Sequence, residues 1–375
     1  GSEMCIRDRM KVQRLLLFSK NEGWEVVSSI SADKNKHGID VGTHLLQYDE
    51  ITELDDESPA ELQGFDIVIP VHHKKEPLAF ALIKRPKTES YETIQEKISF
   101  IETYTNIIIV AIENKRLFQH QIEQERVKKE LELAAQVQTL LIPDQLPKDD
   151  AIEMAAIYQP HRDIGGDYYD YLEVNEDEIV FCIADISGKG IAAALLMANF
   201  QAQLRAYLRQ NYLPITDFIQ QLNKNVNQIT RGDKFITMFL AKYNKATRVL
   251  KYINAGHNPP VLLQNGKSQL LDKGCTILGM FEELPFVNMQ EITLEKGALI
   301  VTYTDGVTDL ENESGELFST ERIVDTVIKN GDIAVEELNH RIFDEVIYFK
   351  GANEFVDDIS ICLLYTSPSP RDSMT

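Results

Sequence analysis

The chain has 375 residues and a formal net charge of -21, with 43% hydrophobic and 26% charged residues. A single hydrophobic core rarely grows beyond roughly 250 residues, so this length predicts two domains. The acidic surface repels phosphate backbones and anionic lipids, which argues against nucleic acid and membrane surfaces as partners. The four cysteines are scattered, without a Cys-x-x-Cys pair, which argues against a zinc site or a disulfide framework and fits a cytoplasmic protein.

Both ends of the chain look foreign to the fold. Residues 1–9 and 366–375 lack an apolar period and resemble translated adapter sequence, and Gly1-Ser2 looks like a cloning remnant. We therefore expect these ends to be non-native and the native protein to extend further in both directions. The apolar stretches between them are shorter than the ~18 residues that span a bilayer, so no membrane insertion is expected.

Residues 10–112 are expected to form a small α/β domain. Strands are predicted at 24–30, 65–71 and 79–83, followed by a helix from about residue 91 to 115 with apolar residues at three- and four-residue steps. The phrase VAIENKRLF, which closes this region, resembles the C-terminal part of a GAF sensor domain. The resemblance implies a truncated GAF-like sensor.

Residues 113–147 are expected to form a linker helix. Apolar pairs four residues apart recur between charged residues of both signs, but their register slips and no strict heptad is sustained. Two interpretations stay open: a solvated amphipathic linker, or a helix that forms a homodimer and reports the state of the sensor. Pro143 and Pro147 end the helix.

After Pro147 the pattern changes to short apolar runs that are typical of strands. In residues 148–365 these strands and the predicted helices are grouped, which favours an α+β layered fold over alternating βαβ units. We therefore predict a sandwich of two sheets flanked by helices. Strands are predicted at 154–158, 179–184, 238–242, 249–253, 261–263, 269–271, 298–304 and 359–364, and helices at 191–212, 215–229, 320–329 and 334–348.

Four aspartates stand where an apolar run meets a loop. Asp185 ends the run IVFCIA, and Asp305 ends ALIVTYT. Asp167 follows two glycines, and Asp357 precedes ISICLL. Hard divalent cations prefer such oxygen ligands, and converging carboxylates repel one another unless a cation neutralises them. Each aspartate alone is typical of an ordinary turn, so the pattern by itself leaves a structural role open.

Five motifs occur in order within residues 130–364: GGDYYDY, ADISGKG, NAGHNPP, YTDGVTD and DDISI. They resemble the motifs of the SpoIIE/RsbU-type serine phosphatases, a branch of the PPM (PP2C-like) metallophosphatases, and ELELAAQVQTLLIP before them resembles that family's regulatory helix. The resemblance implies a PPM-type β-sandwich and a protein-serine/threonine phosphatase with two Mn²⁺ or Mg²⁺ ions. It further implies direct hydrolysis by a metal-bridging hydroxide and a phosphorylated STAS-domain protein as the partner in bacterial signalling.

The resemblance also implies roles for individual residues. Asp185 and Asp167 would be the catalytic pair, with Asp185 bridging the two ions. Within DDISI the first aspartate matches the family ligand, so Asp357 is preferred to Asp358. The expected metal ligands are Asp167, Asp185, the backbone carbonyl of Ile186, Asp305 and Asp357. Residues that could support the ligands or orient bound water are Asp309, Asp170, Gly166 and Gly306.

Three further residues each allow two interpretations. Lys189 stands where many relatives have histidine, and Arg162 lies near Asp167 in the sequence. Each cation could draw in a phosphate or could be a solvated loop side chain. His257 could donate a proton to the leaving serine or could pack within a Gly/Pro turn.

Two rival functions stay open on the sequence. A Gly-Gly-Asp motif also occurs in diguanylate cyclases, although Tyr168-Tyr169 stand where the signature of those enzymes continues with Glu-Phe. The other rival is a regulatory module that keeps the phosphatase fold and binds a partner without turnover. It is disfavoured because all four aspartate positions are filled.

Overall fold

The computed structural model describes residues 12–20, 23–31, 38–73, 76–85, 91–161, 164–210, 214–330 and 333–366. The chain divides into two compact units, Gly1–Arg126 and Val127–Thr375. Helix α3 (Tyr91–Thr139) crosses the boundary between them. The sequence predicted two successive helical stretches here, but the slip in apolar register does not interrupt the backbone, and both stretches belong to one helix.

The N-terminal unit is built on a sheet with the strand order β2-β1-β5-β4-β3. Alternate side chains of a strand face opposite sides, so Leu15 and Leu17 enter one apolar cluster while Leu16 and Phe18 enter another. Both faces of the sheet therefore carry buried side chains. The GAF-like assignment of this unit remains a prediction. The elements are β1 (Arg14–Lys20), β2 (Trp24–Ile30), α2 (Val41–His44), β3 (Thr52–Glu53), η1 (Ala60–Leu62), β4 (Ile67–His73) and β5 (Glu76–Lys84).

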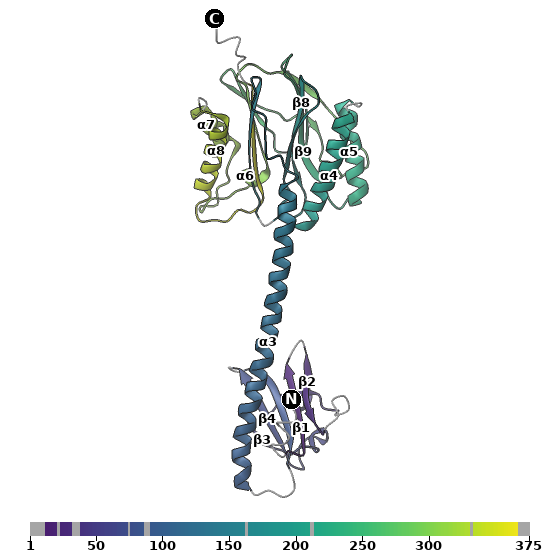
Figure 1. Ribbon diagram of the computed structural model, residues 1–375, viewed down its shortest axis with the longest axis vertical. Coiled ribbons are helices and arrows are strands. Elements are labelled where there is room, and N and C mark those ends of the chain that lie inside the picture. Colours follow the sequence, from purple (N-terminus) through teal and green to yellow (C-terminus); the bar gives the residue numbers. More distant parts are fainter. Residues whose placement is uncertain are drawn as a thin grey trace. The chain divides into compact units, whose positions relative to one another are not determined.

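The C-terminal unit contains two sheets packed face to face (Figure 1). One, the β7–β8 sheet, has the path β13-β10-β9-β8-β7 with β14 paired to β10, and the other, the β15–β16 sheet, has the order β12-β11-β15-β16-β6. The strands are β6 (Ile152–Gln159), β7 (Tyr168–Glu173), β8 (Glu178–Ile186), β9 (Ile236–Asn244), β10 (Val249–Ala255), β11 (Val261–Gln264), β12 (Lys267–Leu270), β13 (Gly274–Cys275), β14 (Gln290–Thr293), β15 (Leu299–Tyr303) and β16 (Ile359–Thr366).

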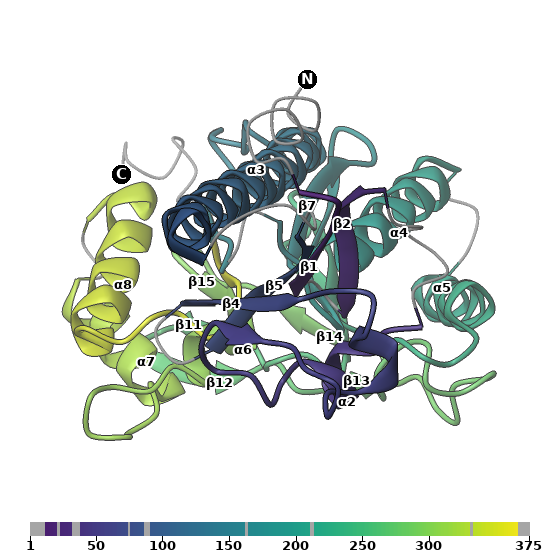
Figure 2. The same cartoon turned by 90° about the horizontal axis from the view of Figure 1, so that it is seen from below.

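Helices cover the outer faces of both sheets. Helices α4 (Ile191–Gln210) and α5 (Ile215–Thr230) flank one side, whereas α7 (Thr320–Lys329) and α8 (Val335–Lys350) flank the other (Figures 1 and 2). A short helix, α6 (Asp305–Thr308), follows β15 directly. This arrangement confirms the predicted α+β sandwich flanked by helices. Among the described residues, no helix combines the length and apolar character needed to cross a bilayer.

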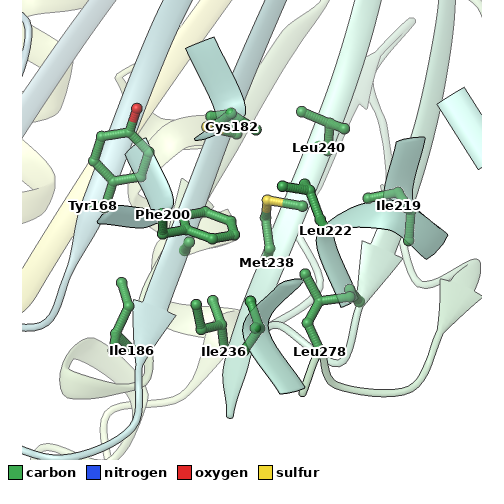
Figure 3. Close-up of a cluster of buried hydrophobic side chains, with 14 of the residues drawn as sticks. Tyr168, Cys182, Ile186, Phe200, Ile219, Leu222, Ile236, Met238, Leu240 and Leu278 are labelled. Carbon is green, nitrogen blue, oxygen red and sulfur yellow. The ribbon is translucent and has the colours of Figure 1, made fainter. Parts of the chain in front are cut away.

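The side chains of β8 alternate between the two faces of its sheet, and both faces are buried. Phe181 and Ile183 pack between the two sheets, whereas Cys182 and Ile186 face α4 and α5. On that outer face, Phe200 of α4 and Leu222 of α5 lie beside Met238 of β9 (Figure 3). A strand buried on both faces is apolar almost throughout, which is why the sequence predicts β8 clearly.

The C-terminal unit differs from the sequence prediction in its strands and at its end, and β7, β13 and β14 are all absent from the predicted strands. Strand β7 is absent from the predicted strands because its sequence, YYDYLE, has acids within it instead of an apolar run. Thr366, expected to lie in a non-native end, is the last residue of β16, where its hydroxyl donates to the carbonyl of Glu295 at 2.8 Å. Residues 1–9 and 367–375 lie outside the described residues.

Candidate metal centre

The four predicted aspartates lie at one end of the sandwich. In the β7–β8 sheet, the start of β7 pairs with the end of β8, with Tyr168 opposite Ala184. In the β15–β16 sheet, the end of β15 pairs with the start of β16, with Tyr303 opposite Ile361. The aspartates adjoin these four strand ends: Asp167 precedes β7, Asp185 lies near the end of β8, Asp305 follows β15, and Asp357 precedes β16.

Asp167 joins the two sheets at this end. Its carboxylate is 2% exposed, and its Oδ2 atom accepts hydrogen bonds from the hydroxyls of Thr304 and Ser360, each at 2.7 Å. Both hydroxyls come from the opposite sheet and are themselves buried. Sequence reasoning missed Thr304 and Ser360. The available signal was that Ser360 shares a strand face with Cys362 and Leu364, which pack between the sheets.

The aspartates raise one another's pKa. Burial raises the pKa of Asp185 to about 7, and the charges of Asp305 and Asp357 add to the rise. Burial also raises the pKa of Asp167 well above its usual value, with the charge of Asp185 as the next cause. The pKa of Asp305 is raised by burial and then by the charge of Asp309. Mutual repulsion of this kind is what bound cations would relieve.

Glycines allow the backbone to close tightly around these carboxylates. A Cβ atom on Gly166 would lie 2.7 Å from the carbonyl oxygen of Ile186, which is the expected backbone ligand. A Cβ atom on Gly306 would collide with the backbone carbonyl of Asp358. Both predicted supporting glycines therefore have a steric role, because any side chain would displace a neighbouring strand end.

The donor set fits hard divalent cations. It consists of carboxylates and a backbone carbonyl, which are the oxygen ligands that Mg²⁺ and Mn²⁺ prefer. Within the described parts of the chain, however, no three acidic, histidine or cysteine side chains already stand in a geometry that would hold a metal ion.

Asp357 and Asp358 have different surroundings. Asp358 is 8% exposed, and its two oxygens accept from the backbone N–H groups of His161 at 2.8 Å and Gly166 at 2.5 Å. Asp357 is half-exposed and forms an ion pair with Lys189 at 2.8 Å. Asp358 therefore fixes the loop that carries Asp167, which leaves Asp357 as the better candidate ligand.

Asp170, a predicted supporting residue of the metal centre, makes side-chain contacts with Tyr168 and with helix α4. It lies on β7, and its carboxylate forms a two-pronged ion pair with Arg205 of α4 through hydrogen bonds of 2.7 and 2.8 Å. The hydroxyl of Tyr168 also donates to it. These contacts connect α4 to β7 and give Asp170 a structural role, and its predicted role in orienting bound water remains a prediction. Asp309, by contrast, is exposed and lies close enough to Asp305 to raise its pKa.

His257 is a packed histidine. Its side chain is 5% exposed, and its Nδ1 atom lies 2.9 Å from the hydroxyl of Thr237, the residue opposite Asp185 in the sheet. Burial lowers the pKa of His257 to about 4. A neutral, enclosed imidazole favours packing within the turn over proton donation to a leaving group. Arg162, the other candidate cation near Asp167, lies outside the described residues.

Two face-to-face sheets covered by helix pairs, with acidic residues at one edge, define the class of PP2C-type phosphatase folds. The fold is similar to the SiaA-PP2C domain of Pseudomonas aeruginosa, with a TM-score of 0.58 and 18% identity over 66% of this chain and 99% of that one. Residues 175–367 match the family model described as stage II sporulation protein E (SpoIIE). The chain belongs to this family, which confirms the resemblance seen in its motifs and removes the diguanylate cyclase alternative.

Two curated relatives from Bacillus subtilis share the C-terminal region. Phosphoserine phosphatase RsbU is 34% identical over 197 residues, which cover 52% of this chain and 58% of RsbU. Phosphoserine phosphatase RsbP is 27% identical over 237 residues, which cover 62% of this chain and 56% of RsbP. The chain therefore spans a little over half the length of each.

Proposed function

We propose that the chain is a metal-dependent phosphoprotein phosphatase that hydrolyses phosphoserine. The observation that carries the proposal is the gathering of Asp167, Asp185, Asp305 and Asp357 at one end of the sandwich, where burial and neighbouring carboxylates raise the pKa values of Asp167, Asp185 and Asp305. The relatives RsbU and RsbP are both phosphoserine phosphatases, which supports phosphoserine as the proposed substrate.

The proposed ligand roles follow from the position of each residue. Asp185, with the carbonyl of Ile186, would bind between two Mn²⁺ or Mg²⁺ ions. Asp167 would hold one ion, and Asp305 with Asp357 would hold the other. Bound ions would activate water and neutralise charge on the phosphoryl oxygens. Because Thr304 and Ser360 both donate to Oδ2 of Asp167, the carboxylate has a fixed orientation and would offer Oδ1 to the ion.

The proposed substrate is the phosphoserine form of a STAS-domain protein. This proposal rests on the family to which the chain belongs and on the phosphoserine phosphatase names of its relatives. The acidic chain, with a net charge of -21, would also need cations at the site to accept a phosphorylated and therefore negatively charged surface.

We also propose that α3 forms a homodimer. Apolar side chains lie exposed along it, including Leu117 at 64%, Phe118 at 63%, Leu133 at 61% and Val137 at 61%. A second copy of the helix would cover this surface, since exposed apolar area is unfavourable in water. Light scattering after size exclusion tests this: a chain that stays monomeric at micromolar concentration contradicts it, and Phe118→Glu should weaken the dimer more than Gln121→Glu.

The proposed activity is tested by the release of phosphate from p-nitrophenyl phosphate and from a phosphoserine STAS protein. The assays contain Mn²⁺, Mg²⁺ or EDTA. We expect metal-dependent hydrolysis that EDTA abolishes. Asp185→Asn should remove the activity while leaving the domain folded, whereas Asp177→Asn, in an exposed turn, should behave as wild type. Activity retained by Asp185→Asn with Mn²⁺ present would contradict the two-metal assignment, and silence of the wild type on both substrates would favour the regulatory module without turnover.

A further inference from the structure

Lys189 occupies a tightly constrained position beside the candidate metal centre. It lies in the short loop between β8 and α4, flanked by Gly188 with φ of 105° and Gly190 with φ of 72°, conformations that glycine adopts without steric cost. The loop is anchored at Ser187, whose N–H donates to the carbonyl of Phe235 at 3.0 Å and whose hydroxyl accepts from the N–H of Phe235 at 2.9 Å. The base of the Lys189 side chain is therefore held in place.

The ammonium group of Lys189 reaches the opposite sheet. Its Nζ atom donates to the carbonyl oxygen of Val356 at 2.7 Å and lies 2.8 Å from Oδ2 of Asp357. The other oxygen of that carboxylate, Oδ1, accepts from the N–H of Asp358 at 2.9 Å. Each oxygen of Asp357 thus has a hydrogen-bond donor, and the positive charge sits on the candidate ligand of the second ion.

We propose that Lys189 is an internal competitor for the cation that Asp357 would bind. The inference rests on the proposed function, in which Asp305 and Asp357 hold one of two divalent ions. An ammonium group and a divalent cation on the same oxygen, Oδ2 of Asp357, would repel each other, so occupancy by one disfavours the other. Binding of the ion is therefore coupled to the departure of Lys189 from Asp357 and Val356.

This competition has a structural consequence for α4. While Lys189 contacts Asp357, the loop that leads into α4 is tied to the loop that leads into β16. Binding of the ion removes that tie two residues before α4, which begins at Ile191. Lys189 therefore sets the concentration of metal at which the second position fills and links its occupancy to the start of α4.

The chain provides a charge-matched control for this proposal. Lys234 lies beside the same loop, with its Nζ atom 2.9 Å from the position that a Cβ on Gly188 would occupy. Lys234→Gln removes the same formal charge near the centre as Lys189→Gln, but it leaves the contact of Lys189 with Asp357 in place. Lys189→Arg keeps the charge and enough reach to contact the carboxylate.

The test is titration calorimetry of Mn²⁺ into the metal-free full chain, without substrate. Lys189 and Asp357 are 48% and 40% exposed, and ion pairs of such exposure are weak, so Lys189→Gln should bind the weaker Mn²⁺ ion about two- to fivefold more tightly than wild type. Lys234→Gln and Lys189→Arg should both stay close to wild type.

Four outcomes are distinguishable. Tighter binding by Lys189→Gln alone supports the competition. An equal gain for Lys189→Gln and Lys234→Gln would show a general charge effect and overturn it, as would weaker binding by Lys189→Gln. If the wild type binds no Mn²⁺ at all, the proposed metal-dependent function fails first, and the competition fails with it.

Discussion

The side-chain amide of Gln138, near the end of α3, makes two hydrogen bonds with the backbone of Gly165. Its Nε2 atom donates to the Gly165 carbonyl at 2.7 Å, and its Oε1 atom accepts from the Gly165 N–H at 3.2 Å. Gly165 lies two residues before Asp167, and Gln138 is only 6% exposed. The end of the long helix therefore holds the loop that carries a candidate metal ligand.

Gln138→Ala should lower both stability and activity. The substitution leaves a buried N–H and a buried carbonyl without their partner, which costs about 1–3 kcal/mol of the free energy of unfolding. Denaturant unfolding and Mn²⁺-dependent hydrolysis measure the two effects. Gln136→Ala, an exposed position on the same helix, is the control. Identical behaviour of the two variants would contradict a role for Gln138 in holding the loop.

Alanine at positions 357 and 358 should have opposite consequences. Asp357→Ala removes a candidate ligand, so calorimetry should show loss or strong weakening of one of the two Mn²⁺ ions, with little change in stability. Asp358→Ala removes the acceptor of two backbone N–H groups, so with Mn²⁺ present it should lower the free energy of unfolding by about 1–3 kcal/mol while both ions still bind. The reverse pattern would make Asp358 the ligand.

Arg205→Gln should be strongly destabilising. The side chain of Asp170 is fully buried, and removing its partner leaves an uncompensated charge inside the protein, which costs about 3–5 kcal/mol. Chemical denaturation of Arg205→Gln, of Asp170→Asn/Arg205→Gln and of the exposed control Arg209→Gln measures this. The double variant should recover part of the loss, because an amide needs no counter-charge. A loss no larger than that of Arg209→Gln would show that the ion pair is dispensable.

His257 should make the protein sensitive to acid. Its pKa is about 4 in the folded chain, because burial disfavours the charged ring, whereas an unfolded histidine titrates near about 6.5. Between these values the unfolded chain binds a proton that the folded chain excludes. The contribution of His257 to the free energy of unfolding is therefore level above about pH 6.5 and falls as the pH drops toward about 4.

His257→Asn should reduce this acid sensitivity. The measurement is the free energy of unfolding of both proteins at about pH 7.5 and about pH 5, where the wild type should lose more stability between the two values than the variant. Comparison of the two differences cancels the titration of the many carboxylates. An equal loss in the two proteins would show that His257 is protonated in the folded state.

Much of the sandwich could be predicted because most of its strands border two packed layers. The run IVFCIA in β8 is apolar without interruption, since one face meets the other sheet and the opposite face meets α4 and α5. Strand β7 could not be predicted in this way, because Asp170 interrupts its apolar sequence. The charge of Asp170 is balanced in the interior by Arg205, which lies 35 residues further along the chain. No local pattern indicates such a partner.

The candidate ligands could be found because each aspartate borders an apolar run. The side chains that contact these ligands could not be predicted in the same way. Thr304 and Ser360 meet Asp167 from 137 and 193 residues away, and which hydroxyl reaches which carboxylate depends on how two sheets stack. The sequence around Lys189 is typical of a solvated loop. Its ammonium group contacts Asp357 only because two loops that are distant in the sequence meet in the fold. Strand alternation can indicate that Ser360 is buried, but the local sequence does not indicate which carboxylate these side chains contact.

Strand β6, the first strand of the sandwich along the chain, pairs from end to end with β16, the last described strand. The ribosome therefore releases β16 only after every other strand of the sandwich has been made, and domains fold as units during synthesis. Until β16 docks, Asp167 lacks Ser360, and Asp357 and Asp358 have not joined the site. A nascent or prematurely ended chain should thus lack the proposed phosphatase activity, which would appear only once the sandwich is complete.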